Sequence, residues 1–432
     1  MRVYPPQAVA STRLVSQLTN PSVEGIKASL LIPGRGQPIP DGALVMDDGQ
    51  IAWVGQQSAI PARYQHIPFT HVPVLMPGLW DCHQHFAGEA PSEGASGYEI
   101  LVNPSAMRGA RAAYELQTTL LAGVTSVREV AGYAGEIAPA IEDGTVVGPN
   151  VYSSHAILCM TGGHGDPTLL PIATVRDASV HNALFAICDG VPECVKAVRL
   201  MVRRGAKLIK VSASGGVYSH ADDPEDAQFS PEELKAMVDE AARSKRIVAA
   251  HCHGKESILN AIHAGVRTIE HGSYLDEECI NLMNEKGVIL IATRQVLEAM
   301  MENPALLPPG RFEQALKIYQ KSKTSYMLAI KSGVKIALGT DFAAGHNGKE
   351  FQYAVEAGMT PLEAIEAGTA NAPETLGAHF APLSGQLRAG YHADVIALSE
   401  NPLDDIRILG QPKKVTHVWK GGKLYKAPER TQ

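Results

Sequence analysis

The sequence predicts an α/β protein: a (β/α)8 barrel of the TIM type with a small β-sandwich domain made from the two ends of the chain. Eight apolar, strand-like runs alternate with helical patterns in the middle of the chain, and such repeated strand–helix units form a parallel sheet. Both ends carry short β-type runs instead. The length of 432 residues fits one barrel of roughly 250 residues plus an accessory domain.

The barrel is expected over residues 76–383. Its first strand is predicted by the apolar run from Val72 to Leu79. The eight strand candidates end near His85, Arg128, His155, Val211, His251, His271, Thr293 and Asp341. An open doubly wound sheet is disfavoured, because the Gly-x-Gly-x-x-Gly turn that it needs after its first strand is absent.

Helix starts and ends are marked between these strands. Ser230 is suited to an N-cap, Pro231 to the first turn, and Glu233 closes a capping box. Pro192 and Pro361 open two further helices. Helix ends are predicted by glycines that precede the next strand and favour a left-handed cap: Gly205, Gly265, Gly287 and Gly333.

The two ends of the chain, residues 1–75 and 384–432, are expected to form one composite β-sandwich domain. In the first, the runs 43–46 and 51–54 flank the turn Asp47-Asp48-Gly49. In the second, the run 415–419 leads into a turn with two glycines. Joining both ends in one domain is the economical arrangement of these strands.

Composition and charge exclude several classes of function. The net charge of -7 argues against nucleic acid or an acidic membrane surface as a partner. No apolar run approaches the roughly 20 residues that span a bilayer. The start of the chain lacks the apolar stretch of a signal peptide, and the six scattered cysteines do not resemble a disulfide framework. The expected compartment is therefore the cytoplasm.

His83 and His85 are the most informative residues of the chain. They end an apolar strand at spacing i, i+2, so both imidazoles point the same way and form half of a metal site. Further ligand-type residues end later strands: Lys210, His251, His271 and Asp341. Because the carboxyl ends of barrel strands converge on one face, these six residues are the candidate metal ligands.

The ligand set favours zinc. Four histidines and one aspartate suit two zinc ions, which then need a bridging anion. Lys210 could supply it, since a buried lysine between two cations loses its proton easily. The neutral amine can add carbon dioxide and become a carbamate. The predicted cofactor is two Zn²⁺ bridged by carboxylated Lys210 and by a hydroxide.

This order of ligands resembles the amidohydrolase superfamily, binuclear subtype, over essentially the full chain. The segment from Gly385 to Asp394 is similar to the one that returns the family's chain to its β domain. Three segments, Thr161–Gly165, Lys210–Gly216 and His251–Gly254, resemble the imidazolonepropionase-like branch. That branch includes Xaa-Pro dipeptidases, carboxypeptidases and ochratoxin-degrading amidohydrolases, and this chain looks especially close to the bacterial members of the last group.

The resemblance and the metals together predict a mechanism. A zinc-bridging hydroxide, available near neutral pH, attacks an amide carbonyl. Asp341 holds the proton of the hydroxide and passes it to the leaving amine as a general acid. His253, two residues beyond His251, is the candidate imidazole for the tetrahedral oxyanion. Asp341 and His253 are therefore the predicted catalytic residues.

Substrate-binding residues are also implied by the resemblance. In carboxypeptidase-like relatives, a histidine in the Gly-Gly-His-Gly loop and a tyrosine after strand 4 bind the free α-carboxylate of the substrate. The matching positions are His164 and Tyr218, and charged hydrogen bonds suit a carboxylate. Arg128 is a third candidate, either for substrate or for pairing with a nearby acid that orients the site; Arg294 is an alternative for this role.

The predicted function is metal-dependent cleavage of the amide bond to a C-terminal amino acid. The expected substrate is a small molecule or dipeptide-like compound with a free carboxylate, such as the N-acyl-phenylalanine ochratoxin A. The alternatives are an Xaa-Pro dipeptidase and a hydrolase of cyclic amides or lactones. A one-metal deaminase is disfavoured by Lys210, and a non-catalytic scaffold by the complete ligand set. The resemblance also implies a homo-oligomer, because relatives assemble, some of them as octamers.

Overall fold

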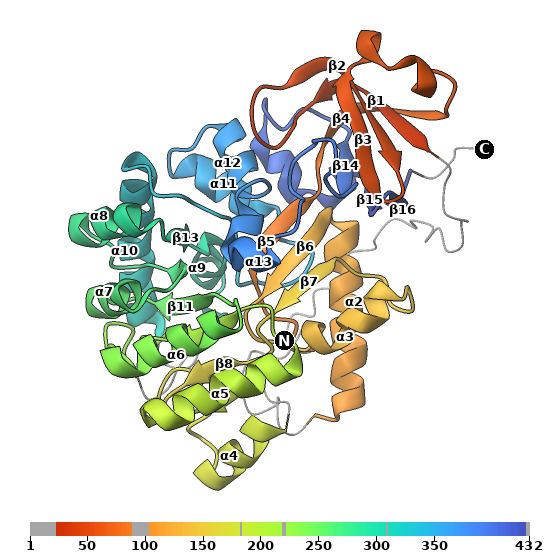
Figure 1. The fold of residues 1–432 in the computed structure, drawn as a ribbon. Coiled ribbons are helices and arrows are strands. Elements are labelled where there is room, and N and C mark those ends of the chain that lie inside the picture. Colours follow the sequence, from red (N-terminus) through yellow and green to blue (C-terminus); the bar gives the residue numbers. More distant parts are fainter. Residues whose placement is uncertain (1–22, 89–102, 182–183, 218–221, 308–309, 429–432) are drawn as a thin grey trace.

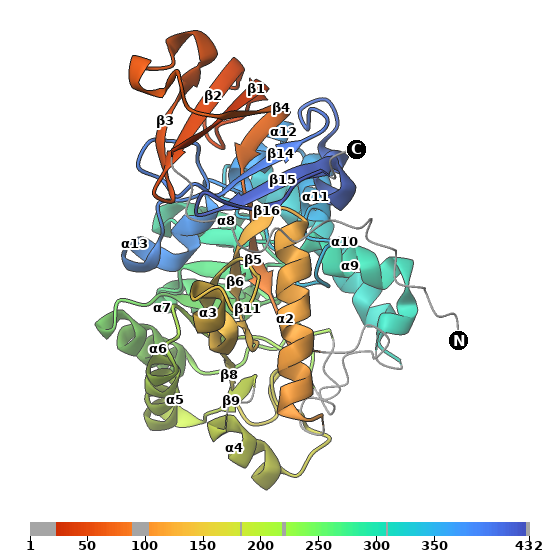
Figure 2. The same ribbon diagram turned by 90° about the vertical axis from the view of Figure 1, so that its right-hand side faces the viewer.

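The computed structural model describes residues 23–88, 103–181, 184–217, 222–307 and 310–428 (Figure 1). A seven-stranded sheet lies at one end of the molecule, and parallel strands surrounded by helices form the rest (Figure 1). The first and last strands of the chain belong to this one sheet, as both views show (Figures 1 and 2). Among the described residues, no helix has both the length and the apolar character needed to cross a membrane.

The seven-stranded sheet has the order β16-β15-β14-β4-β1-β2-β3. Ile51 of β3 and Trp419 of β15 stand far apart in this order but belong to one buried core. The sheet therefore curls over its own apolar face, which gives the packing of a small sandwich. Its strands are β1 (Glu24–Leu31), β2 (Ile39–Asp47), β3 (Gln50–Gln56), β4 (Phe69–Pro77), β14 (Val395–Leu398), β15 (Val415–Lys420) and β16 (Lys423–Lys426).

The barrel strands pair in parallel, as the alternation of strands and helices predicts. One sheet has the order β5-β6-β7, and β10 to β13 lie in sequence order in another. Apolar side chains on alternate positions pack outward under the helices, for example Val211, Ala250 and Ile269. The strands are β5 (Leu79–Gln84), β6 (Val124–Glu129), β7 (Asn150–Ser153), β10 (Ile209–Ser212), β11 (Val248–Cys252), β12 (Thr268–His271) and β13 (Ile289–Ile291).

The expected eighth strand, ending at Asp341, is present as an irregular segment. Ile336 forms a single parallel bridge with Leu290 of β13. On the other side, the carbonyl of Leu338 accepts from the N–H of Cys82, and the N–H of Asp341 donates to the carbonyl of His83. Regular pairing fails because Asp341 has a positive φ of 53°. The segment nevertheless joins β13 to β5 and places Asp341 beside the first strand.

Two short strands extend the sheet beyond the expected pattern. The third barrel strand was expected to end near His155, but β7 ends at Ser153 and His155 itself has a φ of 65°. The chain then forms β8 (Ile157–Cys159), which pairs with both β10 and β9 (Phe185–Ile187). Three-residue runs are too short for periodicity to reveal. The loop after β8 carries His164.

The helices begin and end where the sequence predicts in the best-marked cases. Ser230 caps its helix and forms the expected capping box with Glu233, and the four predicted C-terminal glycines all have a positive φ. The helices are α2 (Ser105–Leu121), α3 (Ala134–Glu142), α4 (Ile172–Val180), α5 (Gly190–Arg204), α6 (Pro231–Arg243), α7 (Lys255–Ala264), α8 (Glu277–Lys286), α9 (Arg294–Glu302), α10 (Phe312–Lys331), α11 (Lys349–Glu356), α12 (Pro361–Ala367) and α13 (Gly377–Phe380).

Gly385 lies where the chain leaves the barrel for the curled sheet. Its φ is 75°, and a Cβ there would lie 2.3 Å from the carbonyl oxygen of Thr369. Its own carbonyl oxygen would lie 2.5 Å from a Cβ on Gly34, in the loop after β1. Three segments thus meet at a point where no side chain fits.

We expect Gly385→Ala to destabilise the fold more than Gly390→Ala. Gly390 also has a positive φ, 85°, but a Cβ there would meet open space. Gly390→Ala should therefore cost only the conformational penalty, about 1–2 kcal/mol, and Gly385→Ala a further 1–3 kcal/mol or so from overpacking. Denaturant unfolding of the two variants measures the difference. Equal losses would show that the close approach at Gly385 carries no energy.

Candidate metal centre and active site

Five of the six predicted metal ligands converge at one end of the barrel strands, with side chains a few ångströms apart: His83, His85, His251, His271 and Asp341. The Nε2 atoms of His85 and His83 lie 3.3 and 3.8 Å from Oδ1 of Asp341. The ring of His271 lies 5.0 Å from that of His83 and 4.6 Å from that of His251. The ligand atoms of His83, His271 and Asp341 fall within 4.8 Å of one another.

Each candidate histidine has one ring nitrogen held by a neighbouring part of the barrel, which leaves the other for the candidate site. Nδ1 of His83 is 2.7 Å from Glu270, that of His85 is 2.8 Å from the carbonyl of Ala131, and that of His271 is 2.7 Å from the hydroxyl of Thr293. His251 differs, since its Nε2 donates to the carbonyl of Gly215 at 3.0 Å. Metal-binding histidines are held in this way, with the second nitrogen as the ligand.

Burial keeps most of these imidazoles neutral, which is the form that binds metal. Burial, helped by the nearby Lys210, lowers the pKa of His83 to about 4. Burial also holds the pKa of His251 and of His271 well below the ordinary value. Although burial raises the pKa of the Asp341 carboxyl, the neighbouring His83 and His85 outweigh it and lower that pKa to about 2.

Lys210, the sixth predicted ligand, is buried at the inner face of β10. Its side chain is 1% exposed, and Nζ has no hydrogen-bond partner in the described structure. Burial lowers its pKa to about 8. An orphaned, fully buried amine is costly unless another group satisfies it. The residues present thus fit a metal centre in which modified Lys210 is a ligand.

Three residues at this end of the strands have left-handed backbone. The φ angles of His271, Thr293 and Asp341 are 69°, 47° and 53°. Such conformations cost about 1–3 kcal/mol each and cluster where side chains must be aimed at a site. In a regular strand the side chains of Glu270 and His271 would point to opposite faces. The left-handed backbone at His271 lets both side chains face inward.

Glu270 and Arg128 form a buried ion pair behind His83. One guanidinium nitrogen of Arg128 lies 2.6 Å from Oε2 of Glu270, and the same oxygen accepts from Nδ1 of His83 at 2.7 Å. Arg128 also donates to the carbonyl of Cys82 and to the hydroxyl of Thr268. Burial would raise the pKa of Glu270, but Arg128 and His83 hold it well below the usual range.

These contacts hold Arg128 inside the barrel wall, whereas the sequence placed it among the candidate substrate-binding residues. Its side chain is fully buried, and its hydrogen-bond partners in the described structure belong to barrel strands. The alternative, in which Arg128 pairs with an acid that orients the site, is the one that this geometry matches. Arg294 is also buried, and its side chain pairs with Glu298 and lies over the ring of Tyr319.

Asp81, which sequence reasoning missed, ties the first strand to the segment before Asp341. Its carboxylate accepts from the backbone N–H groups of His83 and Thr340 and from the side chains of Gln84 and Asn347. Glu270 was missed as well. The available signal was position: Asp81 precedes His83 by two residues and Glu270 precedes His271 by one.

His253 and His164 join the other imidazoles. Nδ1 of His253 is 2.7 Å from the hydroxyl of Ser273, and its ring lies 4.9 Å from that of His271. Its ligand atom is within 4.8 Å of those of His251 and His271, so geometry alone also permits a metal there. The His164 ring stacks on His251 with centroids 4.3 Å apart. Tyr218 lies outside the described residues.

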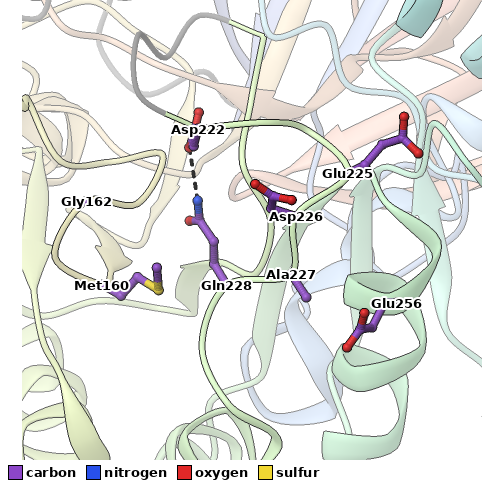
Figure 3. A pocket seen from close by; sticks show the side chains of 8 residues that line it. All are labelled: Met160, Gly162, Asp222, Glu225, Asp226, Ala227, Gln228 and Glu256. Atoms are coloured by element: carbon purple, nitrogen blue, oxygen red, sulfur yellow. Dashed lines mark hydrogen bonds between the residues drawn. The ribbon is translucent and has the colours of Figure 1, made fainter.

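A pocket of about 490 Å³ opens beside the His164 loop. Figure 3 shows its polar lining, with the carboxamide of Gln228 pointing toward Asp222. The lining residues are Met160, Gly162, Asp222, Glu225, Asp226, Ala227, Gln228 and Glu256.

The family model of the amidohydrolase family matches residues 74–425. The chain belongs to the amidohydrolase family. Among its amidohydrolase-fold relatives, ochratoxinase from Aspergillus niger is 52% identical over 417 residues, which is 93% of this chain and 86% of the relative. The crystal structure of that ochratoxinase superposes with a TM-score of 0.89 over 94% of this chain and 96% of its own. A Xaa-Pro dipeptidase with bound methionine is 30% identical, with a TM-score of 0.84 over 94% of this chain and all of its own.

We expect the Glu270–Arg128 pair to tighten metal binding through His83. The double variant Arg128→Met/Glu270→Gln removes both charges and so avoids one uncompensated buried charge. It should weaken zinc affinity by about tenfold or more, because a neutral amide orients His83 less firmly than a carboxylate. Chelator competition measures this affinity. The matched control, Arg294→Met/Glu298→Gln, removes a similar pair away from the ligands; equal affinity of the two variants would refute the role.

Proposed function

We propose that this amidohydrolase cleaves, with bound metal, the amide bond between an acyl group and a C-terminal amino acid, and that N-acyl-phenylalanines such as ochratoxin A are substrates. The observation that carries the proposal is the His164 ring stacked on His251, beside the converging ligands. This stacking brings a candidate carboxylate-binding group next to the candidate reaction centre. The identity of 52% to ochratoxinase supports phenylalanine as the leaving residue.

Six residues would hold two zinc ions: His83, His85, Lys210 as a carbamate, His251, His271 and Asp341. The group of His83, His271 and Asp341 supports one position, and the ring of His251, 4.6 Å from that of His271, supports a second position beside it. Two zinc ions held there would supply a hydroxide nucleophile near neutral pH and would polarise the scissile carbonyl. The protein contributes the orientation of the ligands and a largely dry surrounding, since four of the six side chains, those of His83, Lys210, His251 and His271, are buried.

The roles of the remaining groups follow from their positions. Asp341 is held between His83 and His85 with its low pKa, so it is an ionised acceptor that can take a proton from the nucleophile and deliver it to the leaving amine. His253, fixed by Ser273, would donate a hydrogen bond to the developing oxyanion. His164 together with Tyr218 would bind the substrate carboxylate.

A second candidate function is that of an Xaa-Pro dipeptidase. The 30% identity and TM-score of 0.84 to a Xaa-Pro dipeptidase favour it as the alternative. That structure is described with methionine in its active site, and a free amino acid is the kind of ligand that the His164 position would suit. Assembly as a homo-oligomer and a cytoplasmic location remain predictions of the sequence.

Lys210→Met should lower the zinc content of the purified protein. Methionine keeps the length and fits a buried site, but it cannot form a carbamate and is a poor zinc ligand. We expect about two zinc ions per chain in the wild type and about one or fewer in the variant. Elemental analysis gives the ratio, and Lys207→Met, three residues earlier and exposed, is the control. An unchanged zinc content in Lys210→Met would contradict a ligand role for Lys210.

A substrate panel followed by mass spectrometry tests the proposed function. It contains N-acyl-phenylalanines including ochratoxin A, X-Pro dipeptides, peptides ending in lysine or arginine, and the matching phenylalanine amide. We expect cleavage of the N-acyl-phenylalanine acids and much slower cleavage of the amide, because the amide lacks the carboxylate. Preference for X-Pro would favour the second candidate. Equal cleavage of the acid and the amide would overturn both.

A further inference from the structure

We propose that Gln228 and Asp222 are positioning residues that hold His164 over the metal centre and thereby set the preference for a free carboxylate. This inference rests on the proposed function and extends it to two side chains in the wall of the pocket of Figure 3. Neither residue needs to contact the substrate. Their effect passes through the backbone of the loop that carries His164.

Gln228 uses both ends of its carboxamide to bridge two loops. Its Oε1 accepts from the backbone N–H of His164 at 3.0 Å. Its Nε2 donates to Oδ2 of Asp222 at 3.0 Å, the dashed line of Figure 3. The other carboxylate oxygen of Asp222 faces the backbone N–H of Gly216 at 3.4 Å. Gln228 is 3% exposed, so these hydrogen bonds are sheltered from competition by water.

The same bridge is anchored to the strand that carries Lys210. The backbone N–H of Gln228 donates to the carbonyl of Ala213 at 2.7 Å, directly after β10. Ser214 and Ala227 form a bridge beside it. A displacement of Gln228 is therefore resisted by the barrel itself. The His164 loop, which Asp189 also holds through the backbone N–H and the hydroxyl of Thr161, is thereby tied to β10.

Two glycines make this close arrangement possible. A Cβ on Gly216 would lie 2.0 Å from the His164 ring, and a Cβ on Gly163 would lie 2.7 Å from Oε1 of Gln228. The imidazole of His164 thus lies directly over bare backbone on one side and stacks on His251 on the other. These contacts explain the second glycine of the pair in each motif. They leave the ring little freedom as long as the loop is held.

The experiment compares three variants with the wild type in kinetics, zinc content and thermal unfolding. Gln228→Ala removes both hydrogen bonds. Asp226→Asn is the matched control, because Asp226 lines the same pocket but its side chain is no part of the Gln228–Asp222 bridge to His164. The double variant Gln228→Glu/Asp222→Asn reverses the polarity of one bond: the new carboxylate at position 228 still accepts from the N–H of His164, and the new carboxamide at position 222 becomes the donor. Substrates are an N-acyl-phenylalanine acid and its amide.

For Gln228→Ala we expect KM for the acid to rise by about tenfold or more. The kcat for the acid, kcat/KM for the amide and the zinc content should stay close to the wild type. Asp226→Asn should behave as the wild type. The double variant should restore most of the KM, which a general packing defect would not allow.

Several outcomes would overturn the inference. Gln228→Ala with an unchanged KM for the acid would show that His164 is held by other contacts. An equal loss for acid and amide together with lost zinc would assign Gln228 to folding alone, as would a double variant that restores nothing. If the wild type itself cleaves acid and amide equally, the proposed function fails and the inference fails with it; discrimination that persists in Gln228→Ala removes the inference alone.

Discussion

The arrangement of the site depends on one constraint: several imidazoles are packed together at the end of the barrel, most of them buried and neutral, and each is held through one nitrogen. Buried polar groups without partners are costly, so the barrel supplies an acceptor for each ring, from Glu270, Ala131, Thr293, Gly215 or Ser273. The remaining nitrogens gather around one space together with the ionised carboxylate of Asp341. Lone pairs and a carboxylate facing one another repel unless something electropositive lies between them, which is why the geometry itself supports a metal centre.

The site divides into a rigid half and an adjustable half. The metal half is held by barrel strands and by buried carboxylates, with Asp81 linking β5 to the segment before Asp341 and Glu270 linking β12 to β6 through Arg128. The half proposed to bind the substrate lies on loops, where Gln228 accepts from the backbone N–H of His164 and glycines leave room for its ring. Such a division is expected in this fold, in which the barrel fixes the chemistry and the loops after the strands set the substrate.

The sequence predicted where the candidate ligands lie better than it predicted the residues that support them. His83, Lys210 and His251 follow from position, because they end apolar runs and the ends of parallel strands converge. Glu270 and Arg128 could not be paired from sequence, since their contact spans strands far apart in the chain. The strands β8 and β9 were missed because each has only three residues. Left-handed backbone at His271 and Asp341 follows from tertiary contacts, which local propensity does not contain.

Lys210 lies on the strand that connects the two halves of the site. Burial, helped by the charge of Arg128, outweighs the carboxylates of Glu270 and Asp341 and lowers the pKa of Lys210, so the fold itself pushes this side chain toward its neutral, reactive form. The same strand continues to Ala213 and Ser214, which anchor Gln228 and through it His164. The same segment thus carries both the amine proposed to complete the metal centre and the anchor of the His164 loop. A change that shifts β10 should therefore disturb metal loading and carboxylate recognition together, whereas the substitutions at Gln228 separate them.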